Sequence, residues 1–172
     1  MKKITKILSL GILFLFAFSL QLSAQQCKYN YDKKDPLTGE DTKGIRFSLK
    51  IFWSIGFNKN GNTYSLFMEH CNRGVLVEPL YKGDQLIIKL LNGEIITLSA
   101  PEDIAPSIRY LWAAGDHTFY TGEYGLDVVT LQKIIDNPPT YIRINIGKKF
   151  FDQEILEKER KQIVKAAKCI LQ

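Results

Sequence analysis

The stretch GIRFSLKIFWSIGFNKNGNTYSLFMEHC, residues 44–71, decides the fold class. Apolar residues in its first half share one parity: Ile45, Phe47, Leu49, Ile51 and Trp53. Such period-two alternation is typical of a β-strand with one buried face. Asn60-Gly61 follows, and both residues tolerate the positive φ that a tight hairpin turn requires. The stretch therefore predicts a strand over residues 44–57 that returns through a hairpin along residues 63–71.

The same signals recur further along the chain. Two apolar runs within residues 84–100 meet at Asn92-Gly93 and predict a second hairpin. Residues 73–84 suggest a short strand that is stopped by Pro79. Residues 107–125 suggest one or two strands, and residues 140–147 suggest another alternating strand.

Two segments change to helical spacing. Asp127 can cap a short helix that ends before Pro138. Residues 152–171 predict a longer helix capped by Asp152, whose apolar stripe suits the face of a sheet. Its members are Ile155, Leu156, Ile163, Val164, Ala166, Ala167, Ile170 and Leu171. The fold class expected is α+β: a mainly antiparallel sheet of about six or seven strands, a short helix and a C-terminal amphipathic helix.

The start of the chain predicts export. A lysine-rich beginning, a mostly apolar run over residues 7–22 and the small residues Ser23-Ala24 form a secretory signal over residues 1–24. Cleavage after Ala24 would leave Gln25 first; the alternative is an uncleaved anchor, for which the run is short. Residues 25–44 then form a turn-rich entry segment before a single domain over residues 45–172. The expected product is a soluble periplasmic or extracellular protein without stable membrane insertion.

Charge argues against nucleic-acid binding. Loss of Lys2, Lys3 and Lys6 would leave 20 of the 23 lysines and arginines against 18 acidic residues, a formal charge near +2. These charges are interspersed along the chain, whereas nucleic-acid-binding proteins usually carry a clustered basic face. We therefore expect no nucleic-acid partner.

The three cysteines allow one bridge. Lipidation of Cys27 is rejected, because Gln25-Gln26 precedes it instead of small residues. Cys71 ends an alternating strand, where a buried thiol is ordinary, while Cys169 lies at the edge of the last helix's apolar stripe. We predict a Cys27–Cys169 disulfide with Cys71 free, against the alternative of three unpaired thiols.

Several short motifs resemble a group of uncharacterised exported proteins of Gram-negative bacteria. They are a signal peptide followed by CKYNYDKKDPLTGE, then GDQLIIKLLNGEIITL, TLQKIIDNPPTYIRINI and a closing helix with KCILQ. The resemblance implies export and a single domain. It implies no activity and no catalytic residue.

The residues offer little sign of catalysis. His70 and Cys71 are adjacent, but neighbouring strand residues point to opposite faces, so they do not form a nucleophile–base pair. His117 would reach Cys71 only from a neighbouring strand. No spacing of His, Cys or acidic residues matches a zinc or calcium site. We therefore predict no catalytic residues, no metal and no cofactor.

One aromatic cluster is a candidate binding surface. Its five residues are Tyr110, Trp112, Phe119, Tyr120 and Tyr124. Aromatic side chains beside polar groups suit a protein, peptide or glycan ligand, while the alternative, which we favour, is that they pack the core. The function expected is an exported binding or structural protein of unknown ligand. The alternative is a small periplasmic or extracellular hydrolase.

Overall fold

The computed structural model describes residues 27–50, 52–112 and 114–172, so the predicted signal segment and its cleavage site lie outside the described residues. The described chain is α+β, as predicted, with two helices, α2 (Val128–Asp136) and α3 (Glu157–Ile170). The strands are β1 (Tyr31–Lys34), β2 (Asp41–Lys50), β3 (Trp53–Asn60), β4 (Thr63–Arg73), β5 (Gln85–Leu90), β6 (Ile95–Ser99), β7 (Ser107–Leu111), β8 (Gly115–Leu126), β9 (Pro139–Ile146) and β10 (Lys149–Glu154).

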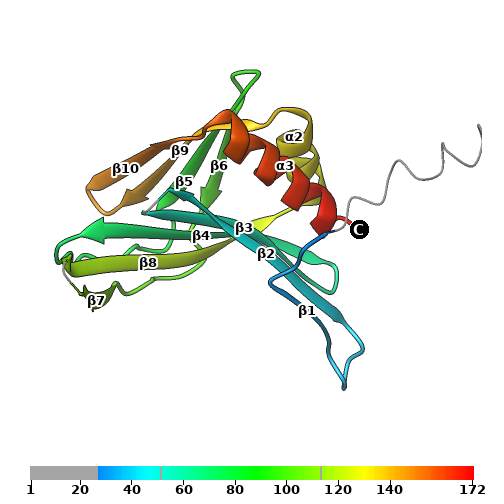
Figure 1. Ribbon diagram of the computed structural model, residues 1–172, viewed down its shortest axis with the longest axis horizontal. Helices are drawn as coiled ribbons and strands as arrows, with labels where there is room; N and C mark the ends of the chain where they lie inside the picture. Colours follow the sequence, from blue (N-terminus) through cyan, green and yellow to red (C-terminus); the bar gives the residue numbers. More distant parts are fainter. Residues whose placement is uncertain (1–26, 51, 113) are drawn as a thin grey trace, which may run out of the picture.

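These strands form two antiparallel sheets (Figure 1). The larger, sheet A, has the order β1-β2-β3-β4-β8-β7, and its six strands match the predicted number. The smaller, sheet B, has the order β10-β9-β5-β6 and had no separate prediction. The short strand expected over residues 73–84 is absent: Arg73 ends β4, and residues 74–84 contribute only an isolated bridge between Leu80 and Ile104.

One apolar core joins the two sheets and both helices. Sheet A contributes alternate residues of its central strands, and sheet B contributes the apolar faces of β5 and β9. Helix α3 packs against α2, β2, β3 and β9, so it lies over the line where the sheets meet (Figure 1). The core members include Ile55, Phe57, Leu66, Met68, Tyr120, Tyr124, Leu86, Ile88, Ile142, Ile144, Leu131, Ile134, Ile163 and Ile170.

The stretch predicted as a single strand over residues 44–57 is two strands, which corrects the sequence analysis. β2 ends at Lys50 and β3 begins at Trp53, and the two strands pair antiparallel. Leu49 before the turn and Trp53 after it both face the core, so the same parity holds on both sides, while Ile51, also predicted to face inward, lies outside the described residues. Since no glycine, proline or asparagine marks the turn, the sequence gives no local sign of it.

Both predicted hairpins form, and the first one turns at Gly61-Asn62, one residue later than the predicted Asn60-Gly61. Asn60 pairs with Thr63 across a two-residue turn in which Gly61 has φ of 56°. The β5–β6 hairpin turns at Asn92-Gly93, where Gly93 has φ of 89°. A side chain would strain both glycine positions, which explains why the turns form there.

The entry segment also belongs to sheet A. β1 pairs with the start of β2, and the Asp35 carboxylate accepts hydrogen bonds from the backbone N–H groups of Leu37 and Thr38 in the turn between them. The predicted turn signals are therefore present, and they join two strands.

The short helix begins as predicted, while the long one begins later. The Asp127 side chain accepts a hydrogen bond from the Thr130 N–H at 2.6 Å and caps α2. Asp152, the predicted cap of the C-terminal helix, lies instead in β10 and pairs with Arg143 on β9. Pairing with β9 keeps residues 149–154 extended, and α3 begins at Glu157. Most of the predicted apolar stripe is buried or half-buried, but Leu156 is exposed, which corrects its place in the stripe. Neither described helix is long and apolar enough to cross a membrane.

A disulfide links the two ends of the described chain. Cys27 and Cys169 are bonded, with their Cα atoms 5.7 Å apart, and Cys71 is free and buried, as predicted. The Tyr29 hydroxyl donates a hydrogen bond to the Cys169 carbonyl at 2.9 Å beside the bridge. The first described residue is thus fixed to α3.

The bridge should contribute strongly to stability. Its two cysteines are 142 positions apart, so it restricts a long loop in the unfolded chain. Cys27→Ser should lower the free energy of unfolding by about 2–5 kcal/mol, measured by urea denaturation. Wild-type protein treated with dithiothreitol is the control and should match the variant. Equal midpoints for oxidised wild type and Cys27→Ser would contradict this contribution.

Candidate functional site

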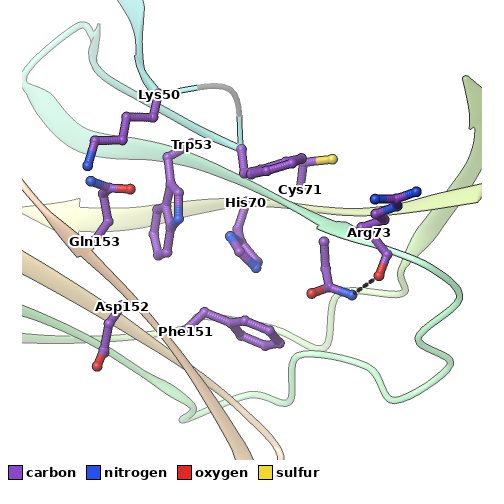
Figure 2. Close-up of a pocket in the computed structure, with 10 residues that line it drawn as sticks. Lys50, Trp53, His70, Cys71, Arg73, Phe151, Asp152 and Gln153 are labelled. Atoms are coloured by element: carbon purple, nitrogen blue, oxygen red, sulfur yellow. Dashed lines mark hydrogen bonds between the residues drawn. The ribbon is translucent and has the colours of Figure 1, made fainter. Parts of the chain in front are cut away.

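An open cleft of about 600 Å³ lies where one end of sheet A faces β10 of sheet B. Small-molecule sites are typically about 300–1,000 Å³, so the cleft has a suitable size. Its walls come from three places: the β2–β3 turn, the end of β4 and the middle of β10. The lining residues are Lys50, Phe52, Trp53, His70, Cys71, Asn72, Arg73, Phe151, Asp152 and Gln153 (Figure 2).

His70 lies between two aromatic rings in this cleft (Figure 2). Its ring centroid is 4.6 Å from that of Trp53 and 4.5 Å from that of Phe151. Only 4% of His70 is exposed, and neither ring nitrogen has a hydrogen-bond partner within the described chain. Buried polar groups are nearly always hydrogen-bonded, so an unpartnered imidazole beside a cleft is a group available to a ligand.

Strand register explains this arrangement. β3 and β4 pair from Asn60↔Thr63 outward, which places Trp53 opposite His70 at the far end of the hairpin. Phe151 comes from β10, where pairing with β9 turns it toward sheet A. The cluster is therefore fixed by backbone pairing in both sheets.

Burial keeps His70 neutral. Desolvation lowers the pKa of His70 to about 4, because the apolar surroundings disfavour the imidazolium. The Phe52 carbonyl favours the protonated ring but lies outside hydrogen-bond geometry and accepts instead from the Cys71 N–H at 2.8 Å. At neutral pH the ring thus has one N–H donor and one nitrogen acceptor.

Cys71 and His70 point to opposite sides of β4, as predicted (Figure 2). Cys71 lines a second hollow of about 410 Å³ together with Phe52, His117 and Phe119. Desolvation, followed by the charge of Glu69, raises the pKa of the Cys71 thiol. A thiol with a raised pKa is a poor nucleophile. His117 Nδ1 lies 3.0 Å from the Gly115 carbonyl.

The five aromatic candidates are divided among three environments. Tyr120 and Tyr124 are fully buried in the core, and Phe119 is half-buried beneath Arg109, 4.7 Å from its ring centroid. Tyr110 on β7 is 69% exposed and Trp112 is 93% exposed. Because two of the five have no exposed surface, these residues do not make one binding face.

Sequence reasoning missed the cleft. The turn predicted at Asn60-Gly61 would pair Trp53 with Met68, whereas the turn at Gly61-Asn62 pairs Trp53 with His70. The contact between Trp53 and His70 therefore depends on a one-residue difference in the position of the turn. Nothing local links either residue to Phe151.

Comparison of the chain with family models, with curated proteins and with solved structures finds no match. The resemblance to uncharacterised exported proteins therefore stays a prediction from sequence motifs. Within the described residues, no group of three or more His, Cys, Asp or Glu side chains is placed to hold a metal ion. The cleft is thus interpreted from its own geometry.

The lowered pKa of His70 should be visible directly. In an NMR titration, the His70 ring resonance, assigned with His70→Gln, should have its midpoint near pH 4. An unfolded histidine titrates near pH 6.5, so the unfolded state takes up a proton first as the pH falls. Stability from neutral His70 is therefore lost between about pH 6.5 and 4, by on the order of 3 kcal/mol relative to His70→Gln. A midpoint near 6.5 would rule out the desolvated ring.

The two core tyrosines should respond differently to loss of the hydroxyl. The Tyr120 hydroxyl donates to the Glu78 carbonyl at 2.7 Å, while the Tyr124 hydroxyl is buried without a partner in the described chain. Tyr120→Phe should therefore lower the free energy of unfolding by about 1 kcal/mol. Tyr124→Phe should leave it unchanged or raise it, as measured by urea denaturation. An equal loss in both variants would refute this distinction.

Proposed function

We propose that the protein is an exported binding protein whose cleft holds a small, largely apolar ligand with one hydrogen-bonding group. The observation that carries this proposal is the unpartnered His70 ring between Trp53 and Phe151. Without a ligand, leaving a buried polar group unpaired costs about 1–3 kcal/mol. A ligand that hydrogen-bonds the imidazole removes this cost, and the two aromatic rings contact its apolar part.

The protonation state of His70 and the apolar lining of the cleft favour the same class of ligand. The neutral ring accepts a hydrogen bond at one nitrogen and donates at the other, whereas a charged ring would favour an anion deep in the cleft. Phe52 adds a further apolar wall at the mouth and is itself partly exposed. The ligand group that reaches His70 is therefore an uncharged hydroxyl, amine or carbonyl.

Export is supported by two independent features. The first 24 residues have the pattern of a secretory signal. The Cys27–Cys169 bridge is of a kind that persists in oxidising compartments such as the periplasm and the cell exterior.

A neutral fluorescent probe tests the proposed function. N-phenyl-1-naphthylamine has an apolar body and one N–H group, and Trp53 in the cleft reports its binding. Since Trp112 is the only other tryptophan, the titration is done in Trp112→Phe. We expect saturable quenching of Trp53 fluorescence with one site per chain.

Neighbouring residues of β10 supply a matched pair of variants. Phe151 faces the cleft, whereas Phe150 is exposed and lies against Arg143, whose guanidinium carbon is 4.4 Å from its ring centroid. Phe151→Gln should weaken probe binding about tenfold, or 1.4 kcal/mol, and Phe150→Gln should not change it. Lack of saturable binding, or equal loss in both variants, would refute the cleft as the site.

A further inference from the structure

The mouth of the cleft is positively charged. Lys50 at the end of β2 and Arg73 at the end of β4 both line it, and both are exposed. Figure 2 shows them on either side of Trp53, His70 and Phe151. Neither belongs to any of the ion pairs formed among the described residues, which involve Arg46, Lys133, Arg143 and Lys161.

The nearby carboxylates are already engaged. Asp152 lines the cleft, but Arg143 donates two hydrogen bonds to it, at 2.6 and 2.8 Å. This pairing lowers the pKa of Asp152 and balances its charge. Glu69 accepts a hydrogen bond from the Thr121 hydroxyl, on the face of sheet A away from the cleft. Two cations at the mouth thus have no acidic partner of their own.

Polarity therefore changes from the interior of the cleft to its mouth. The interior is aromatic and contains a neutral histidine, so an anion placed there would lose its hydration without gaining a counter-charge. At the mouth an anion stays hydrated and lies near Lys50 or Arg73. A ligand that matches both regions has an apolar body and an anionic end.

We propose that the cleft binds anionic amphiphiles: ligands with an apolar chain or ring system, an uncharged hydrogen-bonding group that reaches His70, and a carboxylate head. The apolar body lies in the cleft against the aromatic walls formed by Trp53 and Phe151, and the head faces the cations at the mouth. This inference rests on the proposed function and specifies its ligand class.

Two probes that differ only in the head group test the proposal. Decanoate and decanol, below their aggregation limits at pH 7.5, compete with N-phenyl-1-naphthylamine for the full-length mature protein. Decanol is the more apolar, so binding driven by burial alone favours it. We expect decanoate to bind at least threefold more tightly at low salt, and the preference to shrink at high salt because exposed charges are screened.

Charge-matched variants test whether Lys50 and Arg73 cause the preference for decanoate. Lys50→Gln with Arg73→Gln should abolish the preference for decanoate, and the single variants should each remove part of it. Lys158→Gln with Lys168→Gln, two exposed positions on α3, removes the same charge and should leave the preference intact.

The possible results separate this proposal from the one on which it rests. If the fluorescent probe binds but decanol equals or exceeds decanoate, the anionic head is wrong and the apolar cleft stands. A preference that survives in the Lys50 and Arg73 double variant also overturns the proposal. If the probe does not bind saturably, both proposals fail.

Discussion

The contact between the inner faces of the two sheets determines the rest of this structure. At one end, helices α2 and α3 fill the space beside that contact, and Ile134, Ile163 and Ile170 are fully buried there. At the other end, side chains of β3, β4 and β10 line the open cleft, and neither described helix contributes to its walls. The cleft exists because β3, β4 and β10 extend beyond the part of the fold that core side chains fill.

His70 lies at the boundary between these two regions. One step further into the sheet, its inward-facing neighbour is Met68, which is fully buried in the core. A residue at the boundary is desolvated enough to lose its charge near pH 4 and still borders open space. Strongly perturbed pKa values in clefts are characteristic of functional sites, and here the packing alone explains the perturbation.

Short sequence motifs predicted turns and a helix cap, but they did not predict which strands distant in sequence pair with each other. The turns at Gly61 and Gly93, the cap at Asp127 and the disulfide all follow from short motifs or helical spacing. The β2–β3 turn was missed because core-facing parity continues through it, and Asp152 was misassigned because β10 exists only through its pairing with β9. The contact between Trp53 and His70 depends on the turn at Gly61-Asn62, because the predicted turn at Asn60-Gly61 would have paired Trp53 with Met68. Phe151, some 80 residues further along, required knowledge of how β5 and β9 pair.

The disulfide lies at the helix-covered end of the fold, away from the cleft. It fixes Cys27, the first described residue, to α3, which contacts both sheets. The walls of the cleft have no such link: β10 is an edge strand of sheet B, paired only with β9 among the described strands. Phe151 therefore lies on an edge strand, while Trp53 and His70 lie on inner strands of sheet A. An edge strand can shift with fewer broken hydrogen bonds than an inner one, so of the three walls of the cleft β10 is the one that can shift most readily.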